Sequence, residues 1–298
     1  MPKPLKPYRS YDELVDLFRN RGMVIEDHEC ARCELERISY YRLTGYTFPF
    51  LGADGKFKRG FSFDQAIRLY GFDKRIRSIL FCYLETIEVF ARSVISHEFT
   101  KEYGSGGHYD EQHFADHTYH KDFITSMKLQ ITHNSSAKFV NHHIRVYGGN
   151  MPLWAAAEIM TFTTLSKFYS NLLPEMQELI ASTTNAGKAS YLRNWLHCFS
   201  VLRNACAHFG RLYGETLSPS ISLGASTLKK IPIKGSRTLF AYVIAMVCFL
   251  PNKRDAADLC EDLSALFREF GNDIDISQIG FPTNWPQILM NDITYYNR

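Results

Sequence analysis

The residues best suited to a chemical reaction stand together in one short segment. Arg203, Asn204 and His208 occur within six positions. A neutral imidazole, with an ordinary pKa of about 6.5, can take a proton from a ribose 2′-hydroxyl. A guanidinium can hold a phosphate and stabilise the negative charge that develops on it. Attack by the 2′-oxygen would leave a 2′,3′-cyclic phosphate and a 5′-hydroxyl, so the trio suits RNA cleavage without a metal. The structural alternative is that these cations stabilise a helix dipole.

The relative positions of these side chains depend on a helix that the sequence predicts over residues 190–208. A step of five residues along a helix rises about 7.5 Å and turns about 140°, so Arg203 and His208 do not share a face. Asn204 and His208 are four residues apart and do share one. The long Arg203 side chain can still reach the same phosphate, and a second copy of the chain could bring its motif to the same groove. Gly210 stands where a helix cap is expected.

Two acidic residues on a second predicted helix could support this chemistry. Glu85 and Glu88 are three residues apart and therefore lie on one face of that helix. In a functional interpretation, one of them orients Arg203 or His208. In the structural alternative they are exposed, or Glu88 pairs with Arg92, four residues further along.

Cations beside aromatic rings could bind single-stranded RNA. Arg42 stands near Tyr41 and Tyr46, and such rings stack on bases while a guanidinium meets a phosphate. The alternative is an aromatic plug that packs the N-terminal helices onto the rest of the protein. A second basic patch, which could dock a phosphate backbone or be ordinary solvated surface, consists of Lys74, Arg75 and Arg77.

The sequence predicts neither a metal site nor a cofactor. The histidines between residues 108 and 120 lack a frame of carboxylates or paired cysteines. Cys30 and Cys33 form a lone pair, whereas a structural zinc site normally needs four ligands. The chain has no glycine-rich phosphate loop, nucleophile elbow or dinucleotide fingerprint.

Composition narrows the class of protein. The 298 residues carry 34 Lys+Arg and 31 Asp+Glu, a net charge of +3, which excludes a broadly basic nucleic-acid coat but leaves local patches open. The seven cysteines are odd in number and scattered, and no signal peptide is visible, so we expect a reducing cytoplasm. The longest apolar run, 239–250, is too short to span a membrane and predicts a buried helix.

Helix-capping residues and the helical spacing of apolar residues recur along the chain, and strand signals are few, which predicts an all-α protein. The longest helix is expected over 72–103, a run without proline or glycine. Residues 39–51 are expected to be irregular because Gly45 and Pro49 break a helix. Residues 214–236 are expected to form a loop that can hold a short strand pair. The remaining helices are expected over 11–20, 28–38, 121–132, 136–147, 154–160, 165–172, 174–182, 238–250 and 255–270.

Four blocks of sequence carry a family resemblance over about residues 5–215. They are SYYRLTGY at 39–46, FDKRIR at 72–77, the segment 152–167, and LRNACAHFGRLY at 202–213. Together these blocks resemble the Abi-like family of abortive-infection proteins, the AbiD/AbiF group, which belongs to the HEPN superfamily of helical proteins.

The resemblance implies both a fold and a function. The fold would be a HEPN-like bundle with long antiparallel helices, in which an R-x4–6-H motif marks many metal-independent ribonucleases. The function would be phage defence through growth arrest or RNA damage, by a homodimer whose substrate is RNA and which could also bind a small non-coding RNA. The alternative is a catalytically inactive HEPN module that binds a non-coding RNA or a protein partner.

One departure from the family pattern concerns the residue after the motif histidine. Many relatives carry a second histidine there, where this chain has Phe209, so activity could be weaker if that histidine assists catalysis. Arg211 is retained and is expected to contact phosphate. With these blocks in place, we predict an N-terminal helical and aromatic elaboration over 1–60, a HEPN-like core over 61–215, and a C-terminal loop and helices that complete the bundle over 216–298.

Overall fold

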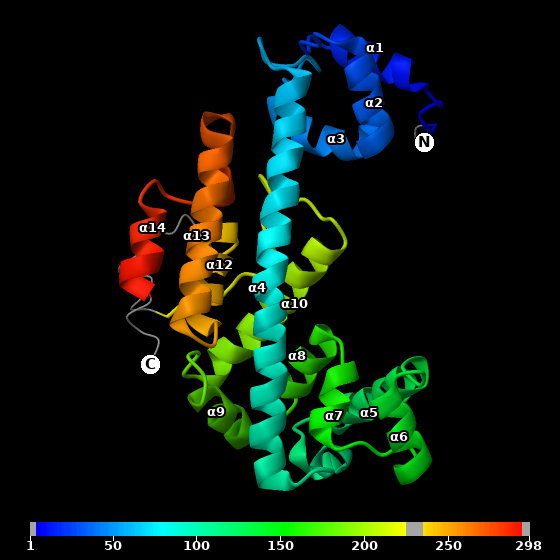
Figure 1. The fold of residues 1–298 in the computed structure, drawn as a ribbon, viewed down its shortest axis with the longest axis vertical. Helices are drawn as coiled ribbons and strands as arrows, with labels where there is room; N and C mark the ends of the chain where they lie inside the picture. The colour runs from blue at the N-terminus through cyan, green and yellow to red at the C-terminus, as the bar shows by residue number, and fades with distance from the viewer. Residues whose placement is uncertain (1–3, 225–234, 294–298) are drawn as a thin grey trace.

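A single long helix, α4 (Phe63–Tyr103), organises the molecule (Figure 1). The computed structural model describes residues 4–224 and 235–293. The 41 residues of α4 span about 60 Å. A capping box starts the helix, since the Ser62 hydroxyl accepts from the Gln65 amide at 3.1 Å and the Gln65 side chain accepts from the Ser62 amide at 3.0 Å. The helix therefore begins nine residues before the predicted position 72, with Gly71 inside it.

Three short helices form a lobe at the N-terminal end of α4, drawn in blue in Figure 1: α1 (Tyr11–Asn20), α2 (His28–Ile38) and α3 (Tyr40–Thr47). They enclose a hydrophobic cluster of their own, which the first turns of α4 complete with Phe63 and Ala66. The interior of the protein is thus divided between this small cluster and a larger one around the rest of α4.

The prediction that residues 39–51 are irregular is wrong. They form α3 and a 3-10 turn, η1 (Phe48–Phe50). The Ser39 hydroxyl caps α3, and Leu43 is fully buried, so burial outweighs the cost of about 1 kcal/mol for Gly45 inside a helix. Pro49 follows the end of α3 and does not interrupt it.

The opposite end of α4 is covered by short helices that enclose part of the larger cluster (Figure 1). Gly104, with a φ of 75°, ends α4, and two 3-10 turns, η2 (Gly107–Tyr109) and η3 (Glu111–His113), lead onward. The helices that follow are α5 (His117–His133), α6 (Lys138–Tyr147), α7 (Leu153–Ile159), α8 (Phe162–Ser170) and α9 (Pro174–Ser182).

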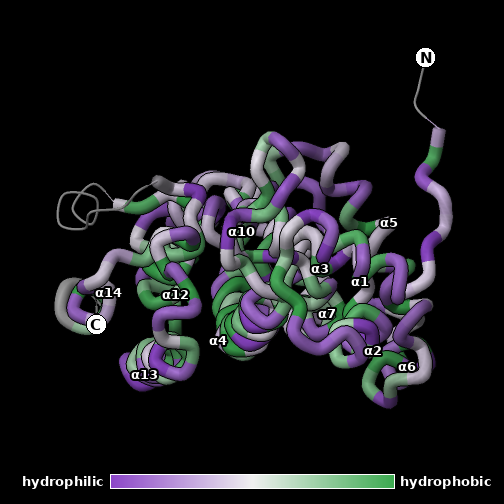
Figure 2. The backbone as a smooth tube through the Cα atoms, turned by 90° about the horizontal axis from the view of Figure 1, so that it is seen from above, coloured by the Kyte–Doolittle hydropathy of each residue, from purple (hydrophilic) through white to green (hydrophobic). Residues whose placement is uncertain are grey.

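The remaining long helices pack along the middle of α4: α10 (Ala189–Ala207), α12 (Leu239–Phe249) and α13 (Lys253–Phe270). Figure 2 shows α12 as an almost wholly hydrophobic tube, and it is buried on all sides, as its apolar run predicts. The short elements η4 (Gly271–Asp273), η5 (Ile276–Ile279), α14 (Trp285–Gln287) and the π-helical η6 (Ile288–Ile293) follow. Among the described helices none is long and apolar enough to cross a membrane.

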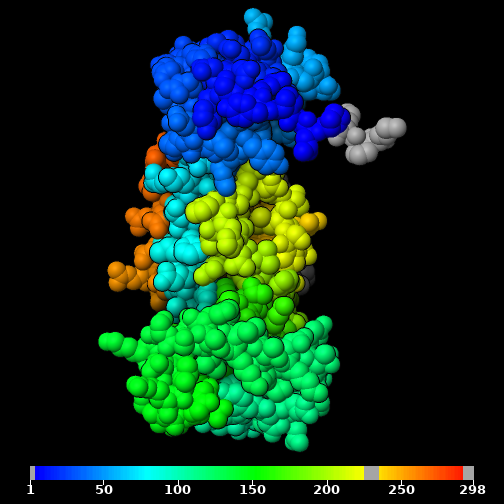
Figure 3. All heavy atoms as spheres, turned by 90° about the vertical axis from the view of Figure 1, so that its right-hand side faces the viewer, coloured from blue at the N-terminus to red at the C-terminus, as the bar shows by residue number. Residues whose placement is uncertain are grey.

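The all-α prediction is confirmed. Across residues 4–224 and 235–293, β-structure is limited to three isolated bridges, such as that between Val24 and Ser62. The described parts of 214–236 form no strand pair, and the rest of that expected loop lies outside the described residues. The boundaries proposed at residues 60 and 215 stay predictions. Figure 3 shows the N-terminal lobe and the α5–α8 region at opposite ends of one face, with the segment that follows α10 between them.

Candidate active site

The Arg–His motif lies at the C-terminal end of α10, where a Schellman-type cap ends the helix. The Gly210 amide donates to the Ala205 carbonyl at 2.7 Å, and the Phe209 amide donates to the Cys206 carbonyl at 3.2 Å. Phe209, with a φ of 59°, therefore occupies the left-handed position, and the expectation that Gly210 fills it is wrong. A left-handed conformation costs a residue with a side chain about 1–2 kcal/mol, so the cap holds Phe209 in a strained state.

Arg203 points from α10 toward α4. Its Nε lies 3.4 Å from Oε2 of Glu88, and its guanidinium carbon lies 5.5 Å from the centre of the Phe81 ring. Glu88 also pairs with Arg92, whose guanidinium donates to the carbonyls at the end of α7, including Met160 at 2.7 Å. Glu88 thus pairs with both Arg203 and Arg92, so it makes the contact that each of the two interpretations requires. Glu85 is exposed and forms no ion pair within the described residues.

Asn204 points toward α8, a different neighbour from that of Arg203. Its Nδ2 lies 3.5 Å from the Thr163 hydroxyl oxygen. His208, four residues later, caps the helix and is exposed to solvent, and its imidazole makes no hydrogen bond within the described residues. The structure therefore places an anchored cation, an anchored amide and a free imidazole at one helix end.

Cations from α3 and α4 hold the segment 209–213 that follows the motif. Arg42 Nη1 donates to the Phe209 carbonyl at 2.7 Å, and Arg77 Nη1 donates to the Gly210 carbonyl at 3.1 Å. The guanidinium of Arg211 donates in turn to the Gly45 carbonyl in α3 and pairs with Glu215. Three of the sequence blocks that carried the family resemblance therefore meet in one clamp.

Asp73, which is fully buried in α4, is the centre of this clamp. One carboxylate oxygen accepts from the backbone amides of Leu212 at 3.0 Å and Tyr213 at 2.7 Å. The other accepts from the Tyr46 hydroxyl at 2.7 Å and from the Arg77 guanidinium. Burial and the neighbouring carboxylate raise the pKa of Tyr46, so its hydroxyl stays protonated and donates.

The residues expected to bind RNA separate into two groups. Tyr46 and Arg77 are buried in the clamp and present no surface to a nucleic acid, and the guanidinium of Arg42 is bound to a backbone carbonyl. The groups that remain open to solvent are Tyr41, with 89% of its surface exposed, and Lys74 and Arg75 on α4, of which Arg75 pairs with Glu269 at 3.1 Å. Arg42 is also exposed, although one of its donors is used by the Phe209 carbonyl.

Comparison with known proteins places the chain in a family. The model of the family described as Abi-like protein matches residues 34–214, more than half of the chain. The chain belongs to the Abi-like family. Membership supports a role in phage defence by abortive infection. No curated protein and no solved structure matches the chain.

The described residues of this Abi-like protein hold no cluster of three or more His, Cys, Asp or Glu that could bind a metal. Cys30 and Cys33 are exposed on α2. Of the histidines between residues 108 and 120, His108 and His120 are buried, with the His120 ring 3.0 Å from the His108 carbonyl. His113 stacks on a tyrosine ring at a centroid distance of 3.9 Å. These histidines serve packing within the fold.

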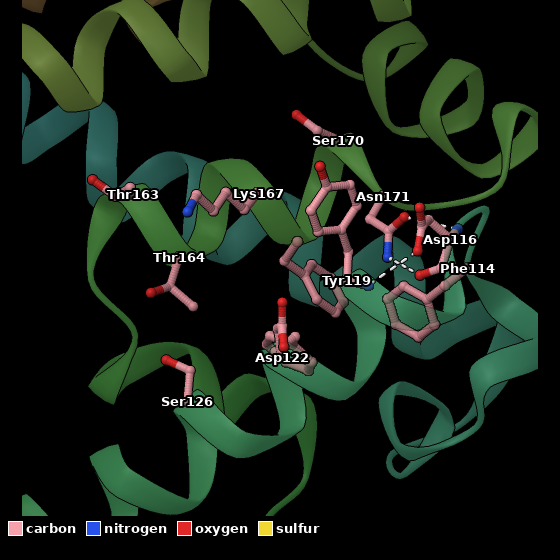
Figure 4. Close-up of a pocket in the computed structure, with 12 residues that line it drawn as sticks. Phe114, Asp116, Tyr119, Asp122, Ser126, Thr163, Thr164, Lys167, Ser170 and Asn171 are labelled. Carbon is pink, nitrogen blue, oxygen red and sulfur yellow. Dashed lines mark hydrogen bonds between the residues drawn. The ribbon is translucent and has the colours of Figure 1, made fainter.

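A cavity of about 580 Å³ lies beside the motif of the Abi-like protein, between α5 and α8 (Figure 4). Thr163 lines this cavity and also contacts Asn204, so the cavity and the motif adjoin. Sequence reasoning missed the cavity, because its walls come from two helices that no motif links. It also missed the role of Asp73, although the spacing of four residues to Arg77 was a visible signal of an ion pair.

Proposed function

We propose that this Abi-like protein is a metal-independent endoribonuclease of the HEPN type, acting in phage defence. The observation that carries the proposal is the arrangement at the end of α10. Arg203 is aligned by Glu88, Asn204 is held by Thr163, and the His208 imidazole is free to meet a substrate. A positioned cation and a free imidazole are what phosphodiester transfer to a 2′-oxygen requires.

The proposed reaction uses each group in a defined role. His208 takes the proton of the 2′-hydroxyl, and the 2′-oxygen forms a bond to phosphorus. Arg203 neutralises the charge that develops on the non-bridging oxygens, and Asn204 donates to the same phosphate. The bond to the 5′-oxygen breaks, and that oxygen receives a proton, leaving a 2′,3′-cyclic phosphate and a 5′-hydroxyl. Glu88 positions Arg203 and does not touch the substrate.

A homodimer would supply the second proton-transfer group. His208 is the one exposed imidazole at the described end of α10, and the neighbouring position holds Phe209, which has no proton to give. A second copy of the chain would bring its own His208 to protonate the departing oxygen. The exposed rings of Phe209 (65%) and Tyr41 (89%), both near the motif, offer apolar surface for such a contact.

RNA cleavage by purified protein tests this proposal. We expect His208→Ala to lower the cleavage rate about 10²–10⁴-fold and Arg203→Ala about 10²–10³-fold. The matched controls are His142→Ala on α6 and Arg254→Ala on α13, which change the same residue types on exposed surface away from the motif. Cleavage should persist in EDTA, and a 2′-deoxy sugar at the scissile bond should block it.

The outcome that contradicts a ribonuclease is full cleavage by both motif variants, or products without cyclic-phosphate ends. A second candidate function is a HEPN module that grips RNA without cutting it, which Phe209 in place of a second histidine favours. In that case wild-type protein binds RNA that remains intact.

All seven cysteines are free, as expected for the reducing cytoplasm in which we place the protein.

A further inference from the structure

The cavity between α5 and α8 is lined by aromatic side chains and is large enough for a heteroaromatic ring. Its volume is about 580 Å³, within the range of small-molecule sites. Phe114, Phe123 and Phe168 are buried and form its apolar base, while Tyr119 stands exposed at its edge. Aromatic side chains in such an arrangement stack on heteroaromatic rings.

Two opposite charges line this cavity without a partner. Asp122 on α5 points into the space, and Lys167 on α8 lies across from it (Figure 4). Neither forms an ion pair or hydrogen bond within the described residues, and both are exposed to solvent. A carboxylate only accepts hydrogen bonds and an ammonium only donates them. A ligand that satisfies both must therefore present donors on one side and acceptors on the other.

The cavity opens next to the groups of the proposed active site. Thr163 forms part of its wall, and its hydroxyl oxygen lies 3.5 Å from Nδ2 of Asn204. Asn204 and His208 lie on one face of the end of α10. A base next to the phosphate that Asn204 contacts would therefore lie beside the cavity.

We propose that this cavity is a base-binding subsite that takes a guanine of single-stranded RNA. The inference rests on the proposed function, since it names a determinant of the RNA that the motif would cleave. Guanine alone among the four bases carries two adjacent donors, N1–H and the N2 amino group, which match the carboxylate of Asp122. Its O6 and N7 accept hydrogen bonds, which matches the ammonium of Lys167. Tyr119 stacks on the ring.

The other three bases cannot donate two hydrogen bonds to the carboxylate of Asp122. Adenine and cytosine each place a ring-nitrogen acceptor beside their amino donor, so one lone pair would face Asp122. Uracil has a single donor between two carbonyl acceptors. An acceptor held against a carboxylate leaves the carboxylate partly unpaired, and that loss is the basis of discrimination.

The experiment measures binding with cleavage switched off. Full-length His208→Ala protein is titrated with labelled oligouridine that contains one central guanosine, adenosine, inosine or uridine. We expect guanosine to raise affinity at least tenfold over uridine and adenosine, and inosine, which lacks the N2 amino group, to lose part of that gain. Asp122→Asn and Lys167→Ala should each reduce the preference for guanosine severalfold. The matched controls, Asp258→Asn on α13 and Lys128→Ala on α5, should keep it.

A second arm separates RNA from free guanine nucleotides. Guanosine monophosphate should compete weakly, because it lacks the flanking phosphates that meet the motif. Binding of the mononucleotide as tight as that of the oligonucleotide overturns RNA as the source of the base. Equal affinity for all four oligonucleotides, or a preference that survives Asp122→Asn, overturns the subsite itself. A guanosine preference in a protein that never cleaves RNA contradicts the ribonuclease and leaves the subsite standing, so the two failures are distinguishable.

Discussion

Replacing Asp73 by asparagine should show that the end of α10 is held in place from α4. The amide oxygen of the substituted side chain can still accept from the two backbone amides, but its NH2 group then faces Arg77, and two donors meet where a carboxylate stood. Breaking a buried ion pair on one side typically costs about 3–5 kcal/mol, because the other charge stays buried without compensation. Since a loss of 1 kcal/mol lowers the melting temperature of a chain of this size by about 2 °C, the variant should melt roughly 6–10 °C lower.

Urea denaturation followed by circular dichroism measures this loss directly. Asp258→Asn, which removes the same charge from an exposed pair on α13, is the control and should change stability by less than about 1 kcal/mol. Adding Arg77→Met to Asp73→Asn removes both charges, and we expect the double variant to lose about 2 kcal/mol less than the sum of the single losses. Additive losses, or a loss in Asp73→Asn as small as in the control, would refute the ionic clamp.

Three other changes follow from contacts described above. Phe209→Gly should stabilise the protein by about 1 kcal/mol, because glycine removes about 1–2 kcal/mol of backbone strain and costs about 0.5–1 kcal/mol in the entropy lost on folding. Phe209→Ala keeps the strain and should not stabilise the protein. Thermal melts compare the two variants. Burial lowers the pKa of His108 to about 4, so the unfolded chain binds a proton between pH 6.5 and 4 that the folded chain does not. Acidification should therefore lower the free energy of unfolding of the wild-type protein by up to about 3 kcal/mol more than that of His108→Phe. Urea titrations at several pH values measure both. Glu88→Gln should lower the cleavage rate constant about tenfold while His208 retains its role; an unchanged kcat would contradict the positioning of Arg203.

The helices were readable from the sequence wherever local pattern and tertiary packing agree. The helix over 174–182 has its predicted limits, since Pro174 starts it. The apolar run at 239–250 could only be a buried helix. Around Gly45 the local pattern and the tertiary packing disagree. Glycine disfavours a helix there, but the burial of Leu43 stabilises one, and the sequence does not show how deeply that side chain lies.

For the candidate site, the sequence predicts which residue types take part but not the contacts that they make. The motif itself predicts Arg203, Asn204 and His208 together, and the structure places them at one helix end. The sequence could not show that Arg42 and Arg77 hold backbone carbonyls, since cations on a surface and cations in a clamp look alike in a sequence. Nor could it place Phe209 at a positive φ, because residue type favours its glycine neighbour there.

The clamp also determines when the motif can take shape as the chain is synthesised. Asp73 meets its backbone partners at residues 212 and 213 across separations of 139 and 140 residues. Closing so long a loop is entropically costly, and the contact cannot form before the later segment has left the ribosome. A nascent chain that carries α1 through α10 but ends before residue 212 therefore has the motif without its anchor at Asp73. The cell is exposed to the assembled site only after translation has passed residue 213.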